Sequence, residues 1–215
     1  MKLLKTLKTQ LKKSITATAI CKVCFKDIDF GLDSIICNKC FNNLDCIYEQ
    51  FFIKNTSGLC IYNYDETFTN LLYRFKGCFD YELKDVFLNR QKNYLKIRYF
   101  NFVLIPIPSW KGEDDIRGFN HVEEIFKSLN LPMIKCLRKK EKFKQSNLNK
   151  QERKKIKQKI EVIDGELLQN KNVLIVDDVM TTGSTINAAI ELLAQYQPKN
   201  IKVLVLARKC RKNKK

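Results

Sequence analysis

Residues 173–185 read Val-Leu-Ile-Val-Asp-Asp-Val-Met-Thr-Thr-Gly-Ser-Thr, and this stretch decides the fold. Its four apolar residues predict a buried strand that ends in two adjacent carboxylates, followed by a short hydroxyl-rich loop and a helix. In an open α/β sheet, ligands bind outside the carboxyl ends of the strands. A helix N-terminus with free N–H groups and hydroxyls binds anions, and carboxylates accept hydrogen bonds from sugar hydroxyls or hold Mg²⁺. The stretch therefore predicts a site for a ligand that carries phosphate and sugar hydroxyls.

The order of these parts resembles the phosphoribosyl pyrophosphate (PRPP) motif of the type I phosphoribosyltransferases. The resemblance implies that Asp177 and Asp178 are the carboxylates associated with the ribose hydroxyls and Mg²⁺. It also implies a loop around the 5′-phosphate, formed by Thr181, Thr182, Gly183, Ser184 and Thr185. The alternatives are an ordinary strand–loop–helix connection with acidic capping residues, or an inherited pocket that does not catalyse.

Two C-x2-C knuckles near the N-terminus predict a metal site. Cys21 and Cys24 form the first, Cys37 and Cys40 form the second, and twelve residues separate them. Each knuckle can place two thiolates on one tetrahedral ion, so we predict a four-cysteine Zn²⁺ site. Four protein ligands leave no open position for water, which makes the predicted zinc structural. Two unrelated pairs of buried cysteines, or a redox C-x-x-C, are the alternatives.

Composition favours anionic partners. The 215 residues include 40 Lys and Arg against 23 Asp and Glu, a net charge of +17, and 45% of residues are hydrophobic. This excess suits nucleic acid, phosphorylated small molecules or an anionic membrane surface. No apolar run approaches the roughly 18 residues that span a bilayer, and no secretory segment is recognised. We expect a cytoplasmic protein, with peripheral association with the inner membrane left open, in which nine cysteines indicate metal binding before disulfides.

Four regions are expected along the chain. Residues 1–17 predict a basic amphipathic helix, which could lie on an anionic membrane or pack its leucines on the body of the protein. Residues 18–56 are assigned to the four-cysteine module and residues 57–208 to the α/β domain. Residues 209–215 form a basic tail.

Within the α/β domain we predict strands at 60–63, 102–105 and 201–207. A helix is expected over 66–76, closing at Gly77, and a longer amphipathic helix over 81–99 with Leu83, Phe87, Tyr94 and Leu95 facing inward. Prolines end the strand at 105, so a loop should lead from there to a helix that begins near residue 121.

Two side chains of that loop are candidates for chemistry. Arg117 is a natural anion ligand because its planar guanidinium matches phosphate, although a surface arginine in a turn is the alternative. His121 is the only histidine. A general base is one interpretation of His121, but we favour a histidine at a helix start that is satisfied by a neighbouring group.

Residues 135–160 form the most basic block, with twelve Lys and Arg against two Glu. We predict that it lies between two core strands, at 133–136 and 161–163. In type I phosphoribosyltransferases this is the place of a flexible hood over the active site. A groove along a nucleic-acid backbone would fit equally, and a solvated charged helix is the alternative. The candidate contacts to DNA or pyrophosphate are Lys139, Lys140, Lys144 and Arg153.

Taken together, the knuckles, Ile-Pro-Ile-Pro at 105–108 with Arg-Gly-Phe-Asn at 117–120, and the acidic motif resemble the bacterial ComF family, also called ComFC or GntX-like proteins. Gln145, Leu148 and Arg153 match part of a further family segment, whereas Lys142 and Ile156 depart from it. The resemblance implies an α/β type I phosphoribosyltransferase fold, a parallel sheet flanked by helices, joined to the zinc module.

The family implies a role in natural transformation, the uptake of DNA by competent cells. Our first hypothesis is a competence protein that binds and handles incoming single-stranded DNA and keeps a PRPP or ribose-phosphate pocket. Aromatic residues interleaved with cations at 73–76 and 94–99 suit base stacking, although their spacing is also that of a core. The alternative is an active Mg²⁺-dependent phosphoribosyltransferase that acts on an unknown acceptor and releases pyrophosphate. A weaker third hypothesis is a scaffold for other competence or recombination proteins.

Overall fold

The computed structural model describes residues 19–28, 35–109, 111–139 and 160–209. The predicted helix at 1–17 and tail residues 210–215 lie outside the described residues, as do Lys140, Lys144 and Arg153 of the basic block. The chain divides into two compact units between Asn43 and Leu44, and we describe each by itself. The sequence had placed this boundary after residue 56. The difference arises because residues 46–53 pair with a neighbouring strand of the larger unit.

The smaller unit contains short elements around the cysteines. Strand β1 (Ala19–Ile20) pairs antiparallel with β2 (Asp27–Ile28), and the chain between them carries the first knuckle. Helix α2 (Asn38–Asn42) begins after Cys37, whose sulfur accepts a hydrogen bond from the backbone N–H of Cys40 at 3.4 Å. The second knuckle therefore lies on the first turn of a helix.

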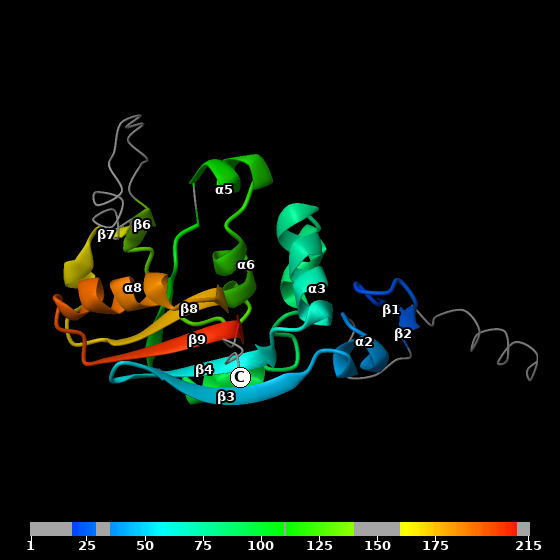
Figure 1. The fold of residues 1–215 in the computed structure, drawn as a ribbon, viewed down its shortest axis with the longest axis horizontal. Coiled ribbons are helices and arrows are strands. Elements are labelled where there is room, and N and C mark those ends of the chain that lie inside the picture. Colours follow the sequence, from blue (N-terminus) through cyan, green and yellow to red (C-terminus); the bar gives the residue numbers. More distant parts are fainter. Residues whose placement is uncertain (1–18, 29–34, 110, 140–159, 210–215) are drawn as a thin grey trace, which may run out of the picture. The chain divides into compact units, whose positions relative to one another are not determined.

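The larger unit is built on a five-stranded mixed sheet in the order β3-β4-β9-β8-β5 (Figure 1). Its strands are β3 (Cys46–Ile53), β4 (Thr56–Asn63), β5 (Phe102–Pro106), β8 (Asn172–Met180) and β9 (Asn200–Arg208). Strands β4, β9, β8 and β5 run parallel, and β3 adds an antiparallel edge. Residues 173–176 of β8 are fully buried, as their continuous apolar character predicted.

Helices flank this sheet. Helices α6 (His121–Lys127) and α8 (Ser184–Ala194) lie on one face of it (Figure 1). Helix α3 (Glu66–Gly77) matches the predicted helix within a residue, and the Asp65 side chain caps it by accepting the Phe68 N–H at 2.8 Å. In the described part of the chain, no helix is long and apolar enough to cross a membrane.

The long helix predicted over 81–99 is wrong. The structure has a 3₁₀ helix η1 (Tyr81–Asp85) and, after a turn, helix α4 (Lys92–Arg98). The buried Tyr62 hydroxyl donates to the Phe87 carbonyl at 2.6 Å, and that carbonyl is the one a continuous helix would give to the Gln91 N–H. Gln91 N–H instead donates to Leu88 at 3.1 Å. Tyr94, predicted to face inward, is 46% exposed.

Two further predictions differ from the structure. The loop predicted after residue 108 contains helix α5 (Lys111–Arg117). The strands predicted on either side of the basic block are not in the main sheet. Instead, β6 (Leu137–Lys139) and β7 (Ile160–Val162) form a separate antiparallel pair, in which Lys139 lies opposite Ile160. Next to the sheet edge at β5, Met133 makes only a single parallel bridge to Leu104. A short 3₁₀ helix, η2 (Gly165–Leu168), leads on to β8.

Candidate functional site

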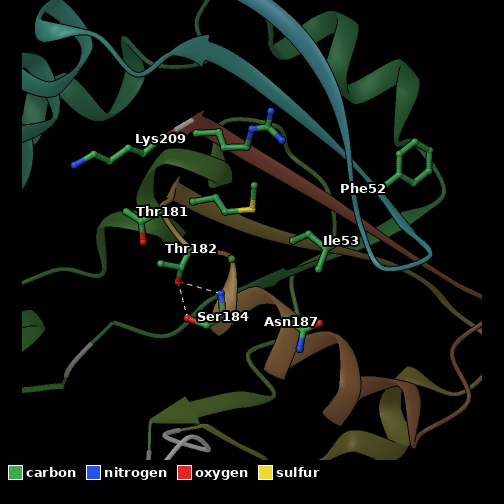
Figure 2. Close-up of a pocket in the computed structure, with 10 residues that line it drawn as sticks. Phe52, Ile53, Thr181, Thr182, Ser184, Asn187 and Lys209 are labelled. Atoms are coloured by element: carbon green, nitrogen blue, oxygen red, sulfur yellow. Dashed lines mark hydrogen bonds between the residues drawn. The ribbon is translucent and has the colours of Figure 1, made fainter. Parts of the chain in front are cut away.

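The hydroxyl-rich loop connects the end of β8 to the start of α8. Gly183 occupies the N-cap with φ at +71°, a left-handed conformation that favours glycine. The Thr182 and Ser184 hydroxyls lie 2.8 Å apart, and the Ser184 N–H donates to Thr182 Oγ1 at 3.4 Å (Figure 2). Thr181 and Thr185 are exposed as well. The five residues predicted as a phosphate loop therefore lie together at the carboxyl edge of the sheet.

This loop forms one wall of a cavity of about 610 Å³. The other walls come from four elements: the β3–β4 hairpin, the end of β8, helix α8 and the end of β9. A signal for the β9 residues existed, because carboxyl ends of neighbouring parallel strands meet at one edge. No local pattern pointed to the hairpin. The residues that the sequence analysis did not assign to this site are Phe52, Ile53, Met180, Asn187, Arg208 and Lys209.

Asp178 is the more buried of the two acids and is held by three donors. Its Oδ1 accepts the Val179 N–H at 2.6 Å, and its Oδ2 lies 2.7 Å from Lys76 Nζ and 3.2 Å from His121 Nε2. Burial alone would raise the pKa of Asp178, but the hydrogen bond from His121 and the charge of Lys76 outweigh it and hold the pKa well below its usual range. Asp178 is therefore ionised and accepts hydrogen bonds only.

Asp177 has a different environment. It is partly exposed, and its Oδ1 accepts the Asp178 N–H at 2.9 Å. Burial raises the pKa of Asp177 well above its usual range, and the neighbouring Asp178 charge raises it further. The two acids of the motif are thus unequal: one is fixed by cationic and N–H donors, and the other is held back from ionisation.

Arg117 contacts the ring nitrogen of His121 opposite the one that faces Asp178, and its side chain is only 7% exposed. Its Nη1 is 3.1 Å from both Asp114 Oδ1 and His121 Nδ1, and its Nε donates to the Lys76 carbonyl at 3.1 Å. Arginine can only donate, so His121 Nδ1 must accept and Nε2 must carry the hydrogen that is donated to Asp178. His121 thus has partners on both ring nitrogens, and the guanidinium expected to meet an anion is engaged by protein groups.

Polar side chains of the segment around Arg117 form hydrogen bonds with one another. Asn120 donates to the Ser109 hydroxyl at 2.9 Å and to Asp114 Oδ2 at 3.0 Å, and Ser109 also donates to Asp114. Asn120 Oδ1 caps α6 by accepting the Glu123 N–H at 3.0 Å. Together these bonds fix the position of Arg117 and of His121, the first residue of α6.

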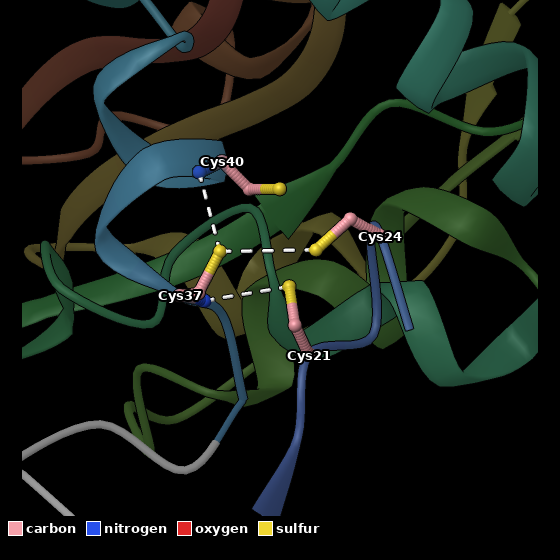
Figure 3. Close-up of side chains that lie close together, drawn as sticks. All are labelled: Cys21, Cys24, Cys37 and Cys40. Atoms are coloured by element: carbon pink, nitrogen blue, oxygen red, sulfur yellow. Dashed lines mark hydrogen bonds between the residues drawn. The ribbon is translucent and has the colours of Figure 1, made fainter. Parts of the chain in front are cut away.

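The four knuckle cysteines form a second candidate site. Their Sγ atoms all lie within 4.8 Å of one another, and those of Cys24 and Cys37 are 3.8 Å apart (Figure 3). Sulfurs bound at 2.3 Å to one tetrahedral zinc would be about 3.8 Å apart. Burial raises the pKa of the Cys21 thiol, but backbone N–H groups, foremost that of Cys37, lower it to about 6. The cluster could hold one metal ion, and its donor set fits zinc.

The aromatic residues proposed to interleave with cations divide by exposure. Phe75 and Tyr99 are 0% and 2% exposed, so neither can stack on a base, and this part of the prediction is wrong. Tyr73 and Tyr94 are 67% and 46% exposed. In each segment the helical spacing places one aromatic side chain in the core, Phe75 or Tyr99, and the other on the surface, Tyr73 or Tyr94.

Comparison with known proteins first identifies the domain. The family model for the phosphoribosyl transferase domain matches residues 115–215, a span that contains β8, the loop and α8. With the sheet described above, this match defines the class: the chain carries a phosphoribosyltransferase domain of the type I fold. The hypoxanthine phosphoribosyltransferase of Staphylococcus aureus is 16% identical and has a TM-score of 0.37 over 59% of this chain and 63% of that chain.

Two curated relatives narrow the identification. Competence protein ComFC of Streptococcus pneumoniae is 29% identical over 168 residues, which cover 76% of this chain and 74% of that protein. Competence protein ComFC of Bacillus subtilis is 29% identical over 137 residues, covering 63% of this chain and 57% of that protein. The chain is homologous to the ComFC competence proteins.

Proposed function

We propose that this chain is a competence protein whose phosphoribosyltransferase domain binds a PRPP-type ligand at the loop after β8. The observation that carries the proposal is the glycine-capped start of α8, with exposed hydroxyls facing a cavity of about 610 Å³. Backbone N–H groups and the helix dipole at such a terminus attract a phosphate. The ribose would then extend toward Asp177 and Asp178, whose oxygens accept hydrogen bonds from hydroxyls.

The acidic residues also suit a Mg²⁺ ion that accompanies the ligand. Mg²⁺ prefers carboxylate and phosphate oxygens and neutralises a pyrophosphate group. Three donors already occupy the oxygens of Asp178, which leaves Asp177 as the carboxylate available to the ion or its waters. Occupation by Mg²⁺ would favour the ionised form of Asp177, opposing the burial that raises its pKa.

Binding of PRPP is tested by calorimetry with Mg²⁺ and the full chain. The double change Thr182→Ala with Ser184→Ala should weaken binding at least about tenfold, because two hydroxyl donors to phosphate are lost. The matched control is Ser128→Ala, which removes a hydroxyl that donates to the Ile125 carbonyl at the end of α6. Unchanged affinity in the double variant would contradict the phosphate assignment. Pyrophosphate release in the same mixture would favour the active transferase, whereas we expect binding without transfer because Arg117 is engaged by Asp114 and His121.

A second proposed activity, the binding of single-stranded DNA, is supported by the exposed surface of α4. Tyr94, Ile97 and Phe100 are 46%, 76% and 74% exposed, with Lys92, Lys96 and Arg98 exposed between them. Across from α4, Tyr48 lies at a bulge in β3 with φ at +46°, and its ring meets Tyr94 edge-on at 5.8 Å. Bulges turn a side chain away from the regular pleat. We name these seven residues the α4 surface.

The α4 surface combines what single strands require. Exposed rings and apolar side chains offer faces for bases, and cations attract the phosphate backbone. No acidic residue occurs between residues 86 and 112 of the sequence, so the cations of this segment have no acidic neighbours within it. Anisotropy of a labelled oligonucleotide at several salt concentrations measures the binding. A DNA role agrees with the net charge of +17 and with the homology to competence proteins.

We further propose zinc as the ion of the four-cysteine cluster, in a structural role. Four thiolates select zinc or iron–sulfur chemistry, and a closed four-ligand set leaves no position for a substrate. Handling DNA on the cytoplasmic side, with partners among competence or recombination proteins, is part of the same proposal and rests on the homology.

A further inference from the structure

Lys76 reaches the acidic motif from a distant part of the chain. It lies at the end of α3, 102 positions before Asp178, and its Nζ is 2.7 Å from Asp178 Oδ2. The Asp178 side chain is 7% exposed, whereas that of Lys76 is 32% exposed. A lysine at a helix end ordinarily extends into water. Here its Nζ lies against a buried carboxylate on β8, the strand that leads into the loop at the cavity.

The position of Lys76 is fixed at both its backbone and its tip. The neighbouring Phe75 is fully buried, and its ring packs on Phe87 at 5.6 Å and on Phe119 at 5.2 Å. Arg117 Nε donates to the Lys76 carbonyl at 3.1 Å. The end of α3 is thus anchored to the segment that also carries His121, the other side-chain donor to Asp178.

The hydrogen bonds that Asp178 already accepts limit the acceptor positions that it can offer to a ligand. An ionised carboxylate has about four acceptor positions. Val179 N–H, His121 Nε2 and Lys76 Nζ occupy three of them among the described residues. One position is left, which matches a single hydroxyl of a sugar. Its direction is set by the three donors, because a carboxylate held at three points cannot rotate.

We propose that Lys76 is a positioning residue of the ribose-phosphate site, which fixes Asp178 for one ribose hydroxyl and balances its charge. This inference rests on the proposed function. Lys76 acts through Asp178 rather than on the pyrophosphate. Removing the charge of Lys76 leaves the buried Asp178 carboxylate without its cationic partner, next to Asp177, so Asp178 loses one of the three donors that orient it and the charge that balances its own.

The test compares Lys76→Met and Lys76→Arg in the full chain by calorimetry. Lys76→Met should weaken PRPP and ribose 5-phosphate by the same factor, about tenfold, since both ligands carry the ribose. Competition by inorganic phosphate, which needs only the loop, should not change. Lys76→Arg keeps the charge and should restore most of the affinity. The matched control is Lys127→Met, which removes a surface ion pair with Glu124.

A double-mutant cycle with Asp178→Asn decides whether Lys76 acts through Asp178. We expect Lys76→Met to cause no further loss of affinity in the Asp178→Asn background. A loss confined to PRPP would mean direct contact with pyrophosphate and would overturn the proposal, as would additive losses or unchanged affinity in Lys76→Met.

The same cycle, measured by thermal unfolding without ligand, separates the two proposals. If the unsubstituted protein binds neither ligand, the proposed function fails. The ion pair can still be tested in that case. If Lys76 and Asp178 interact, Lys76→Met and Asp178→Asn should change the unfolding temperature non-additively. Additive effects would show that Lys76 does not hold Asp178, whatever the protein binds.

Discussion

At the scale of single residues, the acidic motif contains two carboxylates with opposite electrostatic environments. The Asp178 pKa is held low by His121 and Lys76 in spite of burial. The Asp177 pKa is raised by burial and by the Asp178 charge. Such separation of neighbouring pKa values is common where a ligand or ion later supplies the missing charge.

This asymmetry predicts opposite effects of two isosteric substitutions on the ligand-free protein. An acid with a raised folded pKa destabilises the fold above its unfolded pKa of about 3.9, and the effect disappears as the pH falls toward that value. Asp177→Asn should therefore raise the unfolding temperature at neutral pH, with the gain vanishing toward pH 4. Asp178 contributes stability that is fully present above about pH 3.9 and lost as the pH falls through its lowered pKa.

Asp178→Asn should therefore lower the unfolding temperature at neutral pH. Both variants are measured by circular dichroism between pH 4 and pH 8. Equal losses in both would contradict the assignment of environments. The asparagine at 177 keeps the oxygen that accepts the Asp178 N–H, so the comparison isolates charge.

At the scale of elements, long-range hydrogen bonds and packing decided where helices end. The pattern over 81–99 is amphipathic, and Leu83, Phe87 and Leu95 are buried as predicted. The helix is nevertheless divided: the Phe87 carbonyl accepts the Tyr62 hydroxyl, and the Gln91 N–H donates to the Leu88 carbonyl. Division of this segment leaves α4 as a short helix with Tyr94 exposed.

The α4 surface carries an element-scale prediction for DNA binding. Tyr94→Ala should weaken binding of a labelled single-stranded oligonucleotide about tenfold, because stacking contributes about 1–3 kcal/mol per base. Tyr94→Phe keeps the ring and should retain most of the affinity. Arg98→Ala should reduce the slope of affinity against salt by about one phosphate contact.

Phe79→Ala is the control, because it removes an aromatic that is 49% exposed on a different segment. If Phe79→Ala and Tyr94→Ala lower affinity equally, binding is not localised to α4. PRPP affinity should be the same in all of these variants.

At the scale of the whole molecule, the chain contains a small cysteine unit and a larger α/β unit, divided after Asn43. Because a unit this small offers little room for an apolar core, we expect a metal bound by the four cysteines to supply much of its stability. The larger unit has its own core around β8, β9 and α8. The two units should therefore respond separately to metal removal.

Metal analysis of the purified full chain should find about one zinc per chain. Cys24→Ser or a strong chelator should remove it and make the segment before Asn43 sensitive to protease, while PRPP binding persists. Cys78→Ser, an exposed cysteine outside the cluster, should keep the full zinc content. Well under one zinc per chain in protein with reduced thiols would contradict the zinc assignment. A loss of zinc in Cys78→Ser as large as that in Cys24→Ser would contradict it as well.

Local pattern was sufficient wherever a signal lies within a few residues of the chain. The strand, loop and helix at 172–194 follow from an apolar run, a glycine that tolerates φ of +71° and a periodic helix face. The convergence of four cysteines follows from two knuckles at finger-like spacing. These features determined the fold class and the place of both candidate sites.

The tertiary structure alone decided which groups meet at those places. Lys76 and His121 reach Asp178 from segments 102 and 57 positions away, and no spacing rule links them. Phe52 and Ile53 line the cavity because β3 pairs as an edge strand, a partnership set by register rather than by local sequence. The sequence by itself determined the short-range geometry of the strand, loop and helix on which the proposed ligand class rests. The fold determined the charge state of the acids, because burial and distant cations act through space.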